Sequence, residues 1–103
     1  MSASIKVAIA KGSLTAAFVS FLNNEGAPWQ ERHALRVRVG ACIDRIYELF
    51  NEQNDPAALL RTQLAWNEVV ESKVKDPSDV DYYKDQMTEF HNYYYETLRS
   101  DDE

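Results

Sequence analysis

The sequence contains few of the residues that interrupt regular structure. Only three glycines and three prolines occur among its 103 residues. An all-β domain needs many tight turns, and these two residues supply most of them, so their scarcity argues against that class. A single cysteine excludes an internal disulfide, and we therefore expect a reduced, cytoplasmic protein.

The residue patterns of common catalytic and metal sites are also missing. The three glycines are scattered and form no phosphate-binding loop, and there is no Cys-x-x-Cys, His-Glu-x-x-His or Glu-x-x-His pattern. Cys42 and His33 are nine residues apart, which places them on nearly opposite sides of one helix. We expect Cys42 to be a small core residue and His91 to lie at or near the core. The sequence predicts no enzyme, no cofactor and no metal site.

Long apolar runs are lacking as well. No stretch approaches the roughly 20 apolar residues needed to cross a bilayer. Residues 14–22 follow Lys6 and Lys11 and resemble a short signal peptide, but Asn23-Asn24-Glu25 would make a poor cleavage site. We expect an ordinary helix here, and no membrane partner.

Charge is distributed unevenly. Residues 1–51 carry six basic and four acidic side chains, a balance of +2, whereas residues 52–103 carry five basic and thirteen acidic ones, a balance of −8. The net charge of −6 is modest for a mimic of DNA. An acidic half of this kind repels nucleic acid and acidic membranes and attracts a basic surface.

The apolar content, 45% with 12% aromatic residues, is sufficient for one folded domain over residues 1–103. Ile5, Val7 and Ile9 alternate with smaller or charged residues, so residues 3–11 are either a strand or a short helix. Gly12-Ser13 indicates a break and a helix start. A helix to Asn23 follows, with a left-handed cap available at Gly26. Its apolar stripe comprises Leu14, Ala17, Phe18, Phe21 and Leu22.

Three further helices follow, beginning at Pro28, at Asp55-Pro56 and after Asp76-Pro77-Ser78. Gly40, in the middle of the second, leaves room for another helix to approach. The predicted fold class is all-α, a small antiparallel bundle of about four helices, with residues 1–12 uncertain and residues 100–103 a frayed acidic tail. The predicted buried positions are Leu35, Val39, Cys42, Ile43, Ile46, Leu49 and Phe50, then Leu59, Leu60, Trp66, Val70 and Val74, with Leu64 and Val69 flanking that row, then Val80, Tyr83, Met87, Phe90, Tyr94 and Leu98.

The last helix is also informative on its other side. Carboxylates alternate there with two tyrosines, and exposed tyrosine among acidic residues is typical of protein-contact surfaces. The candidate partner-binding residues are Tyr82, Asp85, Glu89, Tyr93 and Glu96. Alternatively, another part of the chain, such as residues 3–11, covers this ridge.

Arginines are concentrated in the second predicted helix. The candidate nucleic-acid or ion-pair residues are Arg32, Arg36, Arg38 and Arg45. A helical wheel places the first two on one flank of the apolar stripe and the other two on the opposite flank. Because no single basic stripe forms, we expect these arginines to cover core edges and pair with acids, and nucleic acid to be a poor partner.

Trp66 falls on an apolar stripe and should be buried, whereas Trp29 is either a local packing contact or an exposed anchor. The leading functional hypothesis is a non-catalytic module that docks on a basic surface of a larger protein. Small acidic helical proteins often act as inhibitors or adaptors, including phage-encoded inhibitors of bacterial defence systems, an analogy of size and charge only. The alternatives are a self-associating structural subunit, such as a homodimer, and a nucleic-acid-binding module.

Overall fold

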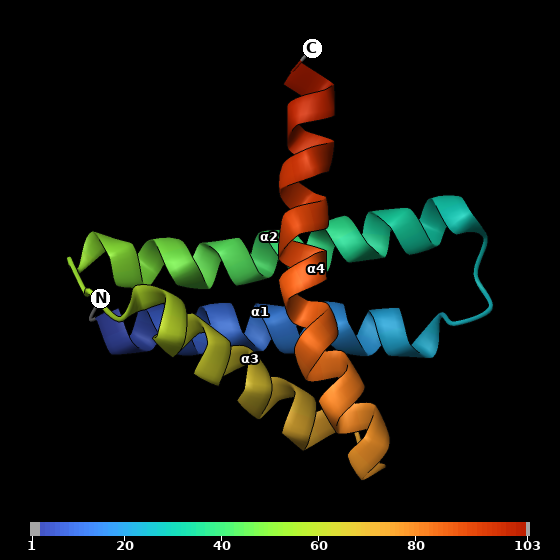
Figure 1. Cartoon of the computed structure of the whole chain (residues 1–103), viewed down its shortest axis with the longest axis horizontal. Helices are drawn as coiled ribbons and strands as arrows, with labels where there is room; N and C mark the ends of the chain where they lie inside the picture. The colour runs from blue at the N-terminus through green and yellow to red at the C-terminus, as the bar shows by residue number, and fades with distance from the viewer. Residues whose placement is uncertain (1–2, 103) are drawn as a thin grey trace.

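The computed structural model describes residues 3–102, with the side chains of residues 4–98, and this part of the chain forms four α-helices (Figure 1). Their bounds are α1 Ala3–Asn23, α2 Trp29–Glu52, α3 Ala58–Lys73 and α4 Pro77–Asp102. The predicted all-α bundle of about four helices is therefore confirmed. The predicted tail at residues 100–103 instead continues α4 to Asp102, and its last residue lies outside the described residues.

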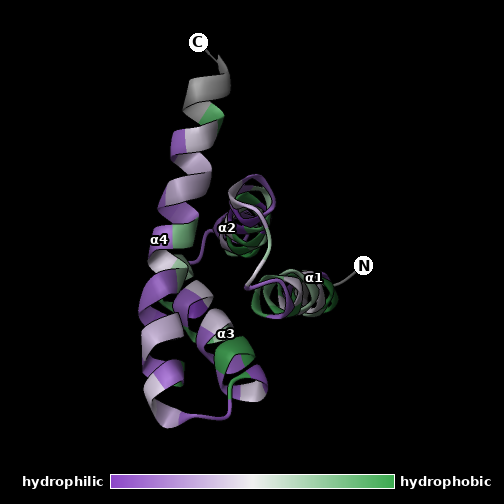
Figure 2. Cartoon of the chain, turned by 90° about the vertical axis from the view of Figure 1, so that its right-hand side faces the viewer, coloured by the Kyte–Doolittle hydropathy of each residue, from purple (hydrophilic) through white to green (hydrophobic). Residues whose placement is uncertain are grey.

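The helices form two layers. In the first layer α1 and α2 run antiparallel, side by side (Figure 1). α3 and α4 form the second layer, with α4 crossing the α1–α2 pair steeply and extending beyond α2 (Figures 1 and 2). This arrangement gives a flat molecule of 40 × 39 × 22 Å.

The first helix is longer and more apolar than the sequence pattern predicts. α1 runs without interruption through Gly12, so the predicted break there is wrong, and residues 3–11 are helix, not strand. Ser4–Asn23 is consequently long and apolar enough to cross a membrane by length and composition, which corrects the expectation about apolar runs. Within its most apolar 18-residue window 28% of the residues are buried, and the buried residues of this stretch belong to the bundle core.

Side chains fix the connections between the helices. Gly26 does not adopt a left-handed conformation, so the predicted glycine cap is wrong. The carbonyl groups at the end of α1 accept hydrogen bonds from Asn24 Nδ2 and from the Arg32 guanidinium instead. Asn54, with φ 56°, makes the left-handed turn after α2. Asp55 then accepts the backbone N–H of Ala57 at 2.8 Å, but α3 begins only at Ala58 and has no side-chain cap, so it starts later than the predicted Asp55-Pro56.

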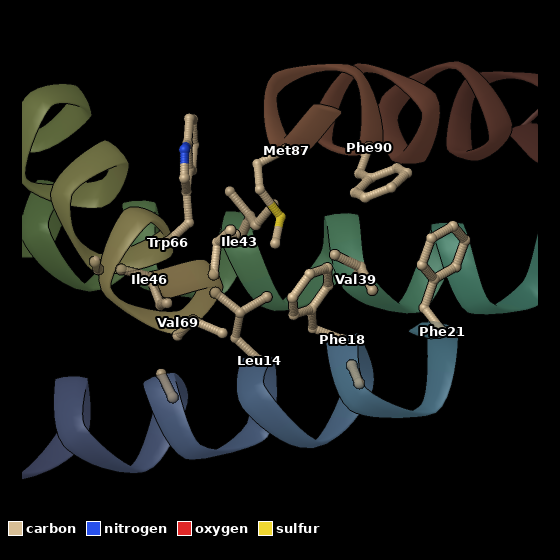
Figure 3. Close-up of a cluster of buried hydrophobic side chains, with 14 of the residues drawn as sticks. Leu14, Phe18, Phe21, Val39, Ile43, Ile46, Trp66, Val69, Met87 and Phe90 are labelled. Carbon is tan, nitrogen blue, oxygen red and sulfur yellow. The ribbon is translucent and has the colours of Figure 1, made fainter. Parts of the chain in front are cut away.

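The core lies between the two layers (Figure 3). Leu14 and Phe18 rise from α1, Ile43 faces them from α2, and Met87 reaches down from α4 into the same space (Figure 3). Trp66 of α3 closes one end and is 4% exposed, as predicted. The apolar stripes expected for α1 and α2 are confirmed, since nearly all of their residues are buried or packed against this cluster.

The predicted core face of α3 is partly wrong. Leu59, Leu60 and Leu64 are each more than half exposed. The buried face of α3 is instead rotated toward Trp66 and the smaller residues around it, and comprises Ala58, Thr62, Ala65, Trp66, Val69 and Val70. Leu98 is also exposed, because the end of α4 projects past α2 and has no helix to pack against (Figure 1).

Gly40 permits the crossing of α2 and α4. A Cβ atom at this position would fall within the contact distance of the Phe90 carbonyl oxygen and 2.6 Å from Tyr94 Cβ. The predicted close approach of a helix at Gly40 is confirmed, and the helix is α4 of the same chain.

Candidate protein-binding site

A cleft of about 500 Å³ opens beside α4, above the ends of α1 and α2 that meet at their connecting turn. It unites residues that the sequence analysis placed in two separate groups, the tyrosines and acids of α4 and the arginines of α2. The lining residues are Phe21, Leu22, Glu25, Arg32, Arg36, Tyr82, Tyr83, Gln86, Glu89, Phe90 and Tyr93. We refer to this set as the cleft.

The floor of the cleft is apolar and firmly built. Phe21 and Phe90 meet edge to face with ring centroids 5.0 Å apart. The Arg32 guanidinium lies 3.8 Å from the centroid of Phe21 and donates hydrogen bonds to the carbonyls of Phe21 and Asn24 at 2.5 and 3.2 Å. Arg32 therefore offsets the negative end of the α1 dipole and is committed to the fold.

Tyr93 forms one wall and is half-buried. Its hydroxyl is hydrogen-bonded to Nδ1 of His33, and the two rings meet edge to face at 5.1 Å. The Arg36 guanidinium lies over the same ring, 5.9 Å from its centroid. The beginning of α2 thus covers part of the α4 ridge, and the suggestion that residues 3–11 do so is wrong.

Two large exposed aromatic side chains lie in the cleft lining and near it. Tyr82 is 55% exposed and packs edge to face on Tyr83. Trp29, at the start of α2, is 73% exposed and contacts the His33 ring. The indole contacts the His33 ring, and the His33 ring contacts Tyr93, which lines the cleft. Trp29 is therefore exposed and lies outside the core, and its ring contact is local, with His33.

The candidate acids lie in different places. Glu89 lines the cleft, where its carboxylate accepts a hydrogen bond from Gln86, and Glu25 faces it from the α1–α2 turn. Asp85 instead borders a shallow depression between α3 and α4. Glu96 is exposed one turn beyond Tyr93 and is absent from the cleft lining. Of the five predicted partner-binding residues, Tyr82, Glu89 and Tyr93 come together in one site.

The electrostatic environment of the cleft is visible in Tyr83. Burial raises the pKa of its phenol above the usual value, and neighbouring Tyr82, Glu25 and Asp79 raise it further. Arg32 acts in the opposite direction. The nearby carboxylates therefore affect the pKa of the Tyr83 phenol more than Arg32 does.

The four arginines are not gathered into one basic surface. Arg32 and Arg36 face the cleft, whereas Arg45 borders a separate groove between α1 and α2 and lies 3.6 Å from Glu48. Arg38 is close enough to Cys42 to lower its thiol pKa. The split between the two flanks of α2, predicted from the helical wheel, is present in the structure.

One cluster of polar residues escaped the sequence analysis. Asp44, only 8% exposed, accepts hydrogen bonds at Oδ1 from His91 Nε2 at 3.1 Å and from the Tyr95 hydroxyl. The Tyr95 hydrogen bond, burial and the nearby carboxylate raise the pKa of that phenol to about 12. A lone acid within the apolar row of α2 was the available signal. His91 lies near the core, as predicted, and this cluster joins α2 to α4.

Cys42 shows no sign of activation. It is half-buried in the groove between α1 and α2, and desolvation raises its thiol pKa more than Arg38 lowers it. Both histidines hydrogen-bond elsewhere, His33 to Tyr93 and His91 to Asp44. Among the residues that the structure describes, no three His, Cys, Asp or Glu side chains are grouped to hold a metal ion.

The chain was compared with protein-family models, curated proteins and solved structures. None of them matches it. The functional argument therefore rests on the cleft itself.

Proposed function

We propose that this protein is a non-catalytic binding module that docks on a larger protein through the cleft and the exposed aromatic side chains in and near it. The observation that carries the proposal is the exposure of Tyr82 in the lining of a cleft that also contains Arg36 and Tyr93, together with the exposure of Trp29 nearby on α2. Tryptophan, tyrosine and arginine dominate the binding energy of protein interfaces. Trp29 is 73% exposed and so is available to a partner.

Charge supports a basic surface as the partner. The chain carries a net charge of −6, and the acids of α4 surround the exposed Tyr82. Electrostatic attraction of this kind speeds association and selects partners of opposite charge. The partner's identity decides whether the module acts as an inhibitor or as an adaptor.

The proposal is tested by capture of the tagged protein's partners from nuclease-treated bacterial lysate, followed by mass spectrometry. Trp29→Ala/Tyr82→Ala is the informative variant, because Tyr93 is bonded to His33 and its removal would also disturb the fold. Leu60→Ala/Leu64→Ala is the matched control, since it removes two side chains of similar exposure from α3. A protein lost with the first variant and retained with the second supports the proposal. Equal capture by wild type and the cleft variant contradicts it.

Self-association is a second candidate, favoured by a different observation. Leu59, Leu60 and Leu64 on α3, together with Ile5 and Ile9 on α1, are all more than half exposed. Apolar side chains left on two helices are suited to an interface with a second copy. Light scattering distinguishes the two candidates, because a monomer at micromolar concentration contradicts self-association.

A further inference from the structure

The side of α1 that is turned away from the core carries no charge. Leu14 and Phe18 point from α1 into the core (Figure 3), and helical spacing places a second row of residues on the opposite side of the helix. Ile9 is 57% exposed in this row, and Gly12 and Ala16 are exposed as well. We call this row the outer face of α1, and it consists of Ile5, Ala8, Ile9, Gly12, Ala16 and Val19.

The outer face has the composition of a buried surface. A helix that meets water on one side normally carries charged residues there, whereas a helix that is apolar all round is normally buried. α1 contains no acidic residue, and its two lysines, Lys6 and Lys11, lie to either side of the outer face by helical spacing. Lys11 is moreover paired with Glu68 of α3. The described part of the chain nevertheless leaves most of the outer face exposed.

Gly12, at the centre of the outer face, has open space above it. Glycine is a poor residue for the middle of a helix, and the close crossing of α4 accounts for the other mid-helix glycine, Gly40. Apart from the backbone of α1 itself, nothing in the described chain lies within 4 Å of the place where a Cβ atom of Gly12 would be. A helix from outside the chain can therefore cross over Gly12 as α4 crosses over Gly40.

We propose that the outer face of α1 packs against the same face of a second copy of this chain, with the two helices antiparallel and crossing at Gly12. This dimer rests on the self-association proposed above and gives it a surface and a symmetry. An interface around a two-fold axis uses the same patch on both copies, so the patch must be complementary to itself. The cleft lies on the α4 side of the molecule and remains free.

The order of large and small side chains along α1 selects the antiparallel pair. With the two-fold axis beside Gly12, Ile9 of one copy lies level with Ala16 of the other, and Ile5 lies level with Ser20. Each isoleucine then meets a small residue, and both copies contribute alike. In a parallel pair each isoleucine would meet its own counterpart, and a gap would remain between the small residues.

The distribution of charge favours a second copy over a basic partner. The outer face has no carboxylate to attract a basic surface, and two chains of net charge −6 can pack closely only where acidic residues are absent. The acids of α4 lie on the other side of the molecule from α1 (Figure 2). The molecule is 22 Å thick, whereas the Debye length at physiological salt is about 8 Å. A pair joined through α1 therefore keeps its two acidic surfaces apart, and salt screens their repulsion.

A lipid surface is the alternative occupant, and the side chains argue against it. Helices that lie in a bilayer surface insert large residues such as tryptophan, phenylalanine and leucine. Gly12 and Ala16 occupy the centre of the outer face. Such small residues gain little from contact with lipid, but they let another helix come close.

The test is sedimentation velocity of the full-length protein at micromolar concentration. Gly12→Leu is the test variant, because leucine fills the crossing point and still favours a helix. Leu60→Ala/Leu64→Ala is the control, since it removes exposed apolar side chains of α3 outside the outer face. Circular dichroism of dilute protein confirms that both variants fold. Flotation with phosphatidylcholine vesicles, with and without phosphatidylserine, tests the lipid alternative.

We expect a wild-type dimer, a dissociation constant at least tenfold higher for Gly12→Leu and one changed less than twofold for the control. Added salt should preserve or strengthen the dimer, because it screens the repulsion between the acidic copies. A monomeric wild type, an undiminished Gly12→Leu dimer, a dimer lost only with the α3 variant or a dimer that salt dissociates would each overturn the inference. A monomer that floats with the vesicles would overturn it in favour of lipid.

Cysteine cross-linking determines the direction of the pair. In a Cys42→Ala background, Ile9→Cys protein mixed with Ala16→Cys protein should form a disulfide-linked heterodimer on mild oxidation. Ile9→Cys alone should not cross-link, because its two copies would lie about 10 Å apart along the helix axis, beyond the reach of a disulfide. Efficient cross-linking of Ile9→Cys with itself would show a parallel pair and contradict the proposed symmetry.

Failure of this dimer can be distinguished from failure of the proposed functions. If wild type is a dimer that Gly12→Leu does not weaken, self-association stands and the outer face is the wrong surface. If wild type is a monomer, self-association fails as well. Capture of a partner through Trp29 and Tyr82 is independent of both results, because Gly12 lies outside the cleft.

Discussion

Gly40 in α2 lies directly against the backbone of Phe90 in α4, with no space for a methyl group between them. The Gly40→Ala variant should therefore be destabilised. Alanine favours a helix by about 1 kcal/mol over glycine, but overpacking costs about 1–3 kcal/mol, and the neighbouring atom here is backbone, which cannot rotate away. Chemical denaturation should show a net loss of up to about 2 kcal/mol.

Gly12 is the matched control for that prediction. It also lies in the middle of a helix, but nothing would contact a Cβ atom there within 4 Å. Gly12→Ala should stabilise the protein by up to about 1 kcal/mol. If both alanine variants shift stability in the same direction, the close α2–α4 crossing is wrong.

Two leucines provide a second matched pair. Leu14 is fully buried at the centre of the core, whereas Leu60 is 56% exposed. Leu14→Ala should cost about 2–5 kcal/mol, because it leaves a cavity, and Leu60→Ala should cost at most about 0.5 kcal/mol. Thermal or denaturant unfolding measures both. Similar losses for the two variants would place Leu60 in a core, as its sequence spacing suggested.

The Asp44 cluster should contribute to holding α4 on α2. Asp44→Ala removes the acceptor for His91 and Tyr95 and leaves a buried donor without a partner, at a cost of about 1–3 kcal/mol. Glu48→Ala, one turn further along α2, is the control, because its pair with Arg45 is exposed and should contribute about 1 kcal/mol or less. Equal effects on the unfolding midpoint would show that the cluster has no special role.

Alkaline pH should weaken the same cluster. The pKa of Tyr95 is raised from its usual value of 10 to about 12, so the folded state retains the proton more strongly than the unfolded state. The resulting stabilisation is complete below pH 10 and is lost as the pH rises through about 12. Ultraviolet titration of tyrosinate, with Tyr95→Phe as the reference, should show one late-titrating phenol. In Asp44→Asn this phenol should titrate closer to 10.

Most of the fold was predictable because the helix stripes and breaks are local signals. The rows Leu14–Phe18–Phe21 and Val39–Ile43–Ile46 identified their buried faces, and Asp76-Pro77 marked a helix boundary. Gly12 was misinterpreted, since an isolated glycine costs only about 1 kcal/mol and the flanking alanines and leucine sustain the helix. The exposed leucines of α3 were misassigned, because Trp66 and the small residues beside it set the rotation of that helix through tertiary packing.

The site was predictable only in part. Helical spacing placed Tyr82, Glu89 and Tyr93 on one stripe, and that stripe lines the cleft. Spacing within one helix does not show which other helix lies alongside, so the contribution of Arg32 and Arg36 was missed. The pairing of His33 with Tyr93 spans 60 residues and depends on the steep crossing of α4, which no local pattern encodes.

The cleft is assembled from two distant parts of the chain, residues 21–36 and 82–93. No fragment that lacks either part contains it, so binding and folding are thermodynamically linked. A partner that recognises the cleft has no site on the unfolded chain and must raise the free energy of unfolding, by about 2.7 kcal/mol at a hundredfold excess over its dissociation constant. A partner of this kind would therefore also lower the fraction of the protein that is unfolded at any moment.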